Sequence, residues 1–414
     1  MNQPSKQNHV FLWTVIGIYL SYFVHGMGVI TLAQNMSHLS LKFGTDDAGI
    51  AYVISGIGLG RLVSILFFGA ISDKFGRKSV IFLGIASYIL FFFGILISPN
   101  LQVAFALAVC AGAANAALDT GGYPALMEAY PKASGTAVIL LKAVISFGQM
   151  FYPMIVSFLL VQQMWYGYAM LIPGGILIIV SLMLLGSRFP SQVVDASIAK
   201  ELPSMKSKPL AWLEGVSSVV FGVAAFSTFY IIVVWMPRYA MAFAGMAEAE
   251  AVKTVSYYSV GSLVCVFVFA WLLKSRMRPV WANVLNSALA VLAGLVIYFF
   301  PSPLVCKLGA FAIGFSAAGG ILQLGVAVMS EFFPKSKAKV TSVYMMAGGL
   351  SNFVIPLLTG YLSQISLKYI ILLDVSCALV ALITAILVFV RYYKVFEIPA
   401  TDIRFGEKAM TAKS

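Results

Sequence analysis

The sequence predicts an all-α membrane protein with twelve transmembrane helices in two pseudo-symmetric six-helix halves. Composition is the first observation, because the 414-residue chain is 61% hydrophobic and only 10% charged, whereas soluble domains are about 25% charged. The second is that the apolar residues fall into twelve runs, and about 20 apolar residues suffice to cross a bilayer as a helix. A repeat at half the chain length then divides the twelve helices into two sets.

The apolar runs follow one another along nearly the whole chain, separated by short polar turns. We expect membrane helices over residues 11–34, 48–70, 79–97, 101–125, 135–160, 166–187, 211–236, 254–273, 279–300, 304–330, 340–363 and 368–391. The segments between these runs are too short for a catalytic domain, and no phosphate-binding P-loop pattern is present, so we expect no enzyme. The histidines and cysteines are not at metal-ligand spacing, so we expect no metal and no cofactor.

The distribution of lysine and arginine predicts the topology. If the amino terminus is cytoplasmic, most of the 27 basic residues fall in turns on the cytoplasmic side, as the positive-inside rule requires. The net charge of +12 therefore reflects topology, and we expect no nucleic-acid partner. The first apolar run is too long for the core of a signal peptide, so we expect it to remain as the first helix.

An internal repeat predicts the division into halves. The segment E-A-Y-P-K at 128–132 recurs as E-F-F-P-K at 331–335, an offset of 203 residues. Two further residue pairs share this offset, Gln149 with Asn352 and Pro153 with Pro356. A proline after an acid also ends ordinary helices, but several coincidences at one offset favour a duplication. The expected parts are a first bundle, a cytoplasmic linker, a second bundle and a cytoplasmic tail, at residues 1–187, 188–209, 210–392 and 393–414.

The turn between the second and third predicted helices carries the most specific motif. It reads G-A-I-S-D-K-F-G-R-K over residues 69–78, and this G-x-x-x-D-x-x-G-R-K pattern resembles the loop between helices 2 and 3 of the major facilitator superfamily of secondary transporters. Four stretches resemble one subgroup, the YdiN-type inner-membrane transporters of enteric bacteria, namely residues 22–28, 117–124, 212–215 and 318–323. The resemblance covers nearly the whole chain and implies a multi-pass protein of a bacterial inner membrane, with both termini cytoplasmic. It does not supply a substrate.

The same resemblance implies a gating role for this turn. The Asp73 carboxylate would lie against the N-terminal end of the eleventh helix, where the helix dipole favours a negative charge. Arg77 would pair with an acid such as Glu128, and the two glycines would allow close helix approach and a tight turn. Alternatively, the basic residues are only topology signals. The complete expected gating motif is Gly69, Asp73, Gly76, Arg77, Lys78 and Glu128.

Ionisable residues within the spans point to the transport site, because such residues are costly in a membrane and commonly face a cavity or a partner. The first half holds Arg61, Asp119, Lys142 and His25, with Tyr22 on the same helical face as His25. Two permanent cations against one carboxylate favour an anionic substrate, which a guanidinium can bind through two parallel hydrogen bonds. A proton on Asp119 would compete with its cationic partner and so link protonation to substrate affinity. Alternatively, Asp119 forms a permanent structural pair with one of the cations, and His25 is simply a buried histidine.

The second half offers neutral candidates for the cavity. Tyr230, Gln323 and Asn352 carry polar groups on predicted helices, and aromatic walls with a few polar groups suit a ring-bearing or hydroxylated solute. Each of them alternatively belongs to the packed core. Two acids, Glu214 at the start of the seventh helix and Asp374 early in the twelfth, are expected to be structural.

The predicted function is therefore secondary active transport by alternating access. The expected reaction is proton-coupled uptake of a small aromatic or hydroxylated carboxylate by a monomer in the lipid bilayer. A drug or metabolite efflux antiporter of the same fold is the alternative, disfavoured by the surplus of buried cations. A non-transporting membrane sensor is more remote, because the short tail carries no partner motif.

Overall fold

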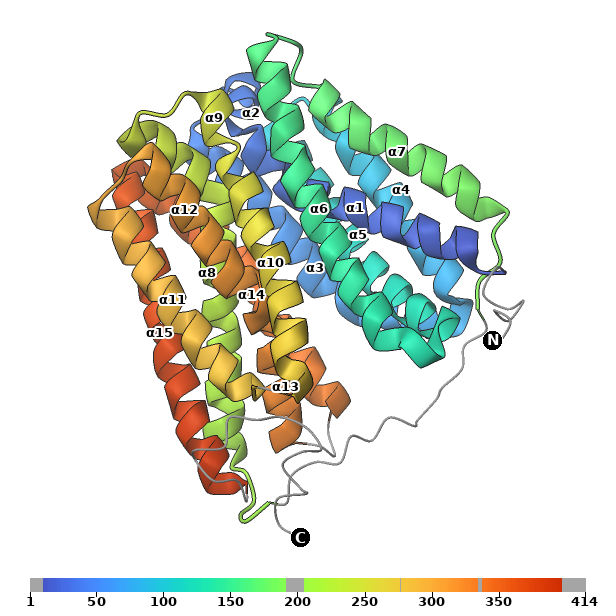
Figure 1. Cartoon of the computed structure of the whole chain (residues 1–414). Helices are drawn as coiled ribbons and strands as arrows, with labels where there is room; N and C mark the ends of the chain where they lie inside the picture. Colours follow the sequence, from blue (N-terminus) through green and yellow to red (C-terminus); the bar gives the residue numbers. More distant parts are fainter. Residues whose placement is uncertain (1–9, 191–204, 276, 334–336, 397–414) are drawn as a thin grey trace, which may run out of the picture. The chain divides into compact units, whose positions relative to one another are not determined.

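The computed structural model of the protein describes residues 10–190, 205–275, 277–333 and 337–396, which are almost entirely helical (Figure 1). Within these ranges eleven helices are long and apolar enough to cross a membrane, and one further apolar helix, over Pro303–Ala317, is shorter. This confirms the prediction of an all-helical membrane fold built from twelve apolar segments.

The predicted segments agree with the observed helices to within a few residues at most ends, and some helices run further into the turns. Their bounds are α1 (Leu12–Gln34), α3 (Asp47–Phe75), α4 (Arg77–Ile97), α5 (Leu101–Ala129), α6 (Ser134–Val161), α7 (Tyr168–Leu185), α8 (Val216–Ala244), α10 (Thr254–Ser275), α11 (Pro279–Phe299), α12 (Pro303–Ile313), α13 (Leu322–Phe332), α14 (Lys337–Ile365) and α15 (Leu367–Val395). Two short helices, α2 (Met36–Phe43) and α9 (Glu248–Ala251), lie in connections. The last helix ends at Val395, two residues beyond the predicted start of the tail at 393.

The tenth predicted span, expected as one helix over 304–330, is wrong in one respect. A π-helical stretch, Gly314–Ile321, interrupts it between α12 and α13. This stretch holds three glycines, and each glycine weakens a helix by about 1 kcal/mol relative to alanine. A hydropathy pattern reports only that the segment is apolar, so it does not detect a change in the helical hydrogen-bonding register.

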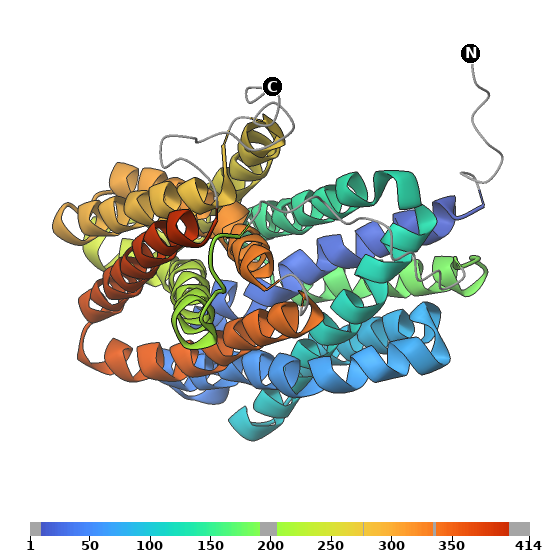
Figure 2. The same ribbon diagram turned by 90° about the horizontal axis from the view of Figure 1, so that it is seen from below.

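The helices divide into two compact units. Unit 1 contains Met1–Asp195 together with two segments from later in the chain, Glu248–Ser256 and Pro356–Gln364. In this unit α5 packs against α3 and α4, and α1 packs against α6 and α7. In unit 2, α15 packs against α8 and α11, and α11 also packs against α12. Helices α1 to α7 of unit 1 run from blue to green in Figure 1, and Figure 2 shows them from below.

Glycines set the closest helix crossings inside unit 1. A Cβ atom at Gly60 of α3 would collide with the Val109 carbonyl of α5, and one at Gly112 of α5 would collide with the Ile57 carbonyl of α3. The two backbones therefore touch without a side chain between them, a packing common in membrane helices. We call this pair of positions the α3–α5 crossing.

Unit 2 repeats this arrangement. A Cβ atom at Gly261 of α10 would collide with the Phe311 carbonyl of α12, and one at Gly314, where α12 ends, would collide with the Tyr258 carbonyl of α10. These glycines lie 201 and 202 residues after Gly60 and Gly112, close to the offset of the sequence repeat. The duplication inferred from the sequence thus reappears as a repeated backbone contact, the α10–α12 crossing.

Candidate functional site

The α3–α5 crossing brings two predicted site residues together. Arg61 follows Gly60 on α3, and Asp119 lies two turns after Gly112 on α5. Arg61 Nη2 is 2.9 Å from Asp119 Oδ2, and the two side chains are 21% and 19% exposed. The pair is therefore partly open to solvent inside a membrane-spanning unit. Among the described residues, this is the one hydrogen bond of the Arg61 guanidinium.

A tyrosine from α1 completes the surroundings of Asp119. The Tyr22 hydroxyl is fully buried and donates to the Leu118 carbonyl at 2.8 Å, and it lies 3.3 Å from Asp119 Oδ1. Its ring stands edge-on to Tyr123, with 5.7 Å between centroids. Tyr22, predicted as a site residue, thus contacts the carboxylate that the sequence proposed as the coupling group.

Lys142 enters the same cluster from α6. It interacts with the Tyr123 hydroxyl, and its charge acts on His25. Helices α1 and α6 can approach closely because Gly148 of α6 packs against the Phe23 carbonyl of α1. Arg61, Lys142 and Asp119 all act electrostatically on Tyr123 and His25, so the charged side chains of the cluster are two cations and one carboxylate, an arrangement that suits an anion.

His25 lies in a buried network that sequence reasoning missed. Its Nδ1 is 2.9 Å from the Tyr88 hydroxyl of α4, and that hydroxyl donates to Asn115 Oδ1 of α5. All three side chains are buried. Tyr88, Asn115 and Tyr123 are neutral residues within apolar runs, and only the isolated asparagine in an alanine-rich stretch could have drawn attention to this network.

The predicted gating motif is organised around Arg77. Its Nη1 donates to Ser72 Oγ at 2.7 Å and to Asp73 Oδ1 at 2.9 Å, and its Nη2 lies 3.2 Å from Glu128 Oε1. Gly76 has a positive φ of 86°, which lets the chain turn between α3 and α4. The turn is thereby tied to the end of α5, where Glu128 lies.

Three other expectations for this motif have different outcomes. Lys78 Nζ donates to the Leu185 carbonyl at 2.8 Å and to the Ser187 carbonyl, so it caps the C-terminal end of α7. A Cβ atom at Gly69 would meet nothing within 4 Å, so no close helix approach occurs at Gly69 among the described residues. The Asp73 side chain is 77% exposed, and its expected contact at the start of α14 involves side chains outside the described residues.

The candidates of the second half are buried polar groups on separate helices. Tyr230 on α8 and Asn352 on α14 are buried, and neither the Tyr230 hydroxyl nor Asn352 Oδ1 has a hydrogen-bond partner among the described residues. Gln323 lies on α13, and its side chain is outside the described residues. The charged groups of the site are therefore gathered in unit 1, whereas unit 2 offers neutral ones.

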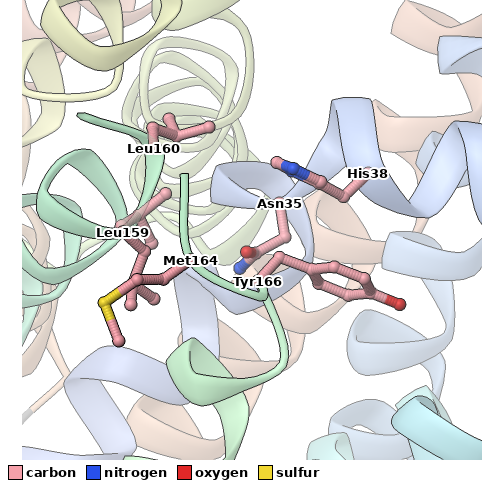
Figure 3. Close-up of a pocket in the computed structure, with 7 residues that line it drawn as sticks. Asn35, His38, Leu159, Leu160, Met164 and Tyr166 are labelled. Carbon is pink, nitrogen blue, oxygen red and sulfur yellow. The ribbon is translucent and has the colours of Figure 1, made fainter. Parts of the chain in front are cut away.

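A small pocket lies apart from this cluster in unit 1 (Figure 3). It is lined by Asn35, His38, Val156, Leu159, Leu160, Met164 and Tyr166. The His38 and Tyr166 rings stack there with 5.0 Å between centroids. Its free volume is about 10 Å³, room for about one water molecule, so the pocket is too small for an organic solute.

The chain is similar to a known protein family, to several known sequences and to solved structures. Residues 18–323 match the family model described as Major Facilitator Superfamily. The chain is 70% identical to the inner membrane transport protein YdiN of Escherichia coli K12, over 99% of this chain and 97% of that protein. It is 23% identical to GudP of the same organism, described as a probable galactarate/D-glucarate transporter, over 86% of this chain and 88% of that protein. Among solved structures, a D-xylose-proton symporter superposes with a TM-score of 0.74 at 12% identity, covering 96% of this chain and 100% of that one.

Proposed function

The chain belongs to the major facilitator superfamily, and from this premise we propose that it takes up a small organic carboxylate together with protons. The carrier would be a multi-pass protein of a bacterial inner membrane with both termini cytoplasmic, working as a monomer by alternating access. The location in an inner membrane and the transport function are supported by YdiN, which is 70% identical and is described as an inner membrane transport protein.

The geometry of Arg61 is the observation that carries the proposal. One of its five N–H donors is used by Asp119 among the described residues, and a fifth of the side chain is exposed. The remaining donors form the planar fork that binds a carboxylate through two parallel hydrogen bonds. The surplus positive charge from Lys142 favours an anion over the cations that a drug-efflux antiporter would carry.

Asp119 would supply the coupling to protons. When ionised, the Asp119 carboxylate pairs with the Arg61 guanidinium. A substrate carboxylate would have to compete with Asp119 for that guanidinium. A proton on Asp119 Oδ2 would remove that competitor and release Arg61 for the substrate. Binding of the proton and binding of the anion would then favour each other, which is the thermodynamic requirement of a symporter.

Two relatives support these finer parts of the proposal. The superposed D-xylose carrier is, by its title, a proton symporter. GudP is, by its description, a probable carrier of galactarate and glucarate, which are hydroxylated carboxylates. Aromatic neighbours such as Tyr22 and Tyr123 would add walls for a ring or a hydroxylated chain.

The turn around Arg77 would serve as the cytoplasmic gate. Arg77 joins the α3–α4 turn to Glu128, so its ion pairs would hold the ends of α3, α4 and α5 in one arrangement. We infer that Asp73 contributes by a contact that forms in the outward-open state, where its exposed carboxylate would meet a helix N-terminus.

Thermal stabilisation of the detergent-purified protein tests the substrate class. The panel contains shikimate, quinate, benzoate, D-xylose and a lipophilic cation such as tetraphenylphosphonium. A ligand that binds only the folded state raises the melting temperature by mass action. We expect a carboxylate to raise it and Arg61→Gln to abolish the shift.

Arg391→Gln is the matched control. Arg391 pairs with the buried Glu214 at 2.6 Å and is 23% exposed, so its geometry resembles that of Arg61, and it belongs to unit 2 instead of unit 1. This variant should keep the carboxylate shift. Stabilisation by lipophilic cations alone would contradict the anion proposal and favour an efflux pump. Binding without net flux in proteoliposomes would favour a sensor.

A further inference from the structure

Asp374 on α15 does not have the paired environment expected of a structural acid. Its side chain is fully buried, and neither carboxyl oxygen has a hydrogen-bond partner among the described residues. On the facing helix α11, Gly294 lies beside it, and a Cβ atom at Gly294 would lie 3.6 Å from Asp374 Oδ2, an ordinary van der Waals contact. The tighter contact of that Cβ atom would be with Val375 Cγ2, at 2.8 Å, so the missing side chain at Gly294 lets α11 pack closely beside Asp374 and Val375 inside unit 2.

The surroundings of Asp374 contain no cation to balance an ionised carboxylate. The groups that interact with it electrostatically are neutral, Tyr258 of α10 and Cys377 one turn further along α15. Ser227 of α8 reaches Cys377 rather than Asp374. Among the described residues, no lysine, arginine or histidine acts on Asp374. The Tyr258 hydroxyl is itself buried and without a partner.

The other buried acids of unit 2 show what a structural acid looks like in this chain. Glu214 is fully buried, pairs with Arg391 at 2.6 Å and accepts the Leu210 backbone N–H at 2.7 Å. Glu331 accepts the Tyr392 hydroxyl at 2.6 Å. Asp374 has neither kind of partner. An ionised carboxylate without a counter-charge or a donor is strongly disfavoured in an apolar interior, so the group takes its neutral form.

We propose that Asp374 is a second proton-binding carboxyl, located in unit 2 and separate from Asp119. The carboxyl holds its proton in the arrangement described here. It exchanges that proton when the packing of α15 against α11 loosens and water reaches it, and the Tyr258 hydroxyl then donates a hydrogen bond to the carboxylate that remains. The use of this proton for transport rests on the proposed function, whereas the existence of the site does not.

Infrared spectroscopy of the purified protein tests the site without any substrate. At pH 7 the wild type is expected to show the carbonyl band of a protonated carboxylic acid, and Asp374→Asn should remove it. After transfer to D₂O the wild-type band should shift to lower frequency as the proton exchanges. Asp119→Asn should leave both observations unchanged, so a failure of the proposed coupling at Asp119 is distinguishable from a failure of this site.

Glu214→Gln provides the matched control, because Glu214 is an equally buried acid of the same unit. That variant should remove a carboxylate band instead and should lower the melting temperature by leaving Arg391 unpaired. Asp374→Asn replaces a neutral acid by a neutral amide of the same size, so its melting temperature should equal or exceed that of the wild type. Loss of a carboxylate band from Asp374→Asn, or a wild-type acid band that never shifts in D₂O, would overturn the proposal.

Discussion

The replacement of Arg61 by glutamine distinguishes a purely structural ion pair with Asp119 from a role of Arg61 in binding the substrate carboxylate. Breaking a fully buried pair costs about 3 to 5 kcal/mol because one charge stays behind unpaired, whereas an exposed pair contributes at most about 1 kcal/mol. Both side chains are about a fifth exposed. We therefore expect Arg61→Gln to lower the free energy of unfolding by about 2 to 3 kcal/mol, a value between these limits.

A double-mutant cycle then distinguishes structure from function. In Arg61→Gln/Asp119→Asn no charge of the pair remains, so most of the lost stability should return. Uptake should not return, because the guanidinium that would bind the substrate carboxylate is still missing. The loss of even one of the two parallel charge-assisted hydrogen bonds costs about 1.5 to 3 kcal/mol, so the affinity should fall by at least about tenfold.

The assays are thermal unfolding in detergent and uptake into proteoliposomes of the carboxylate that stabilises the wild type. Arg391→Gln again serves as the control, with a stability loss expected and uptake retained. If the double variant recovered both stability and uptake, Arg61 would serve only to balance Asp119. The proposal of a carboxylate-binding arginine would then be refuted.

Three further predictions concern the gate, the packing and the connections. Asp73→Asn should largely abolish uptake while leaving ligand-induced stabilisation intact, and unchanged uptake would remove the gating assignment. Gly60→Ala should prevent recovery of a monodisperse folded protein, because its Cβ atom would collide with a backbone carbonyl, whereas Gly175→Ala, where nothing lies within 4 Å, should behave as wild type. The Gln364 amide donates to Asp46 at 3.0 Å and, with the Gly49 N–H, holds the pKa of Asp46 below its ordinary value. The Gln364–Asp46 hydrogen bond therefore stabilises the fold at neutral pH, and this stabilisation is lost as the pH falls through the folded-state pKa of Asp46. The melting temperatures of wild type and Gln364→Leu should differ at pH 7 and converge as the pH falls below about 4.

The sequence predicted the helices well because the bilayer imposes one strict requirement, about 20 apolar residues for each crossing. It also singled out Arg61 and Asp119, which are conspicuous among apolar neighbours and which form an ion pair in the structure. The π-helical stretch at Gly314–Ile321 was not predicted, because hydropathy is unaffected by which carbonyl accepts each backbone hydrogen bond.

Neutral partners and burial were harder to infer. Tyr88 looks unremarkable in sequence and Asn115 stands out only as an isolated asparagine among alanines, so their contact with His25 follows only from the packing of α4, α5 and α1. From the sequence, Asp374 is expected to be structural because it lies early in the last helix, which is expected to be peripheral. Only the packing of α15 against α8 and α11 decides that its carboxyl group points into the bundle and away from lipid.

The paired glycine crossings have a mechanical consequence. Where α3 meets α5, and again where α10 meets α12, one backbone rests directly on another. No rotatable side chain lies between the two backbones at these positions. We therefore expect the two helices of each pair to move together as a rigid unit, so that a displacement at one end of the pair is transmitted to the other end. Each of the two units contains one such rigid helix pair, α3 with α5 and α10 with α12.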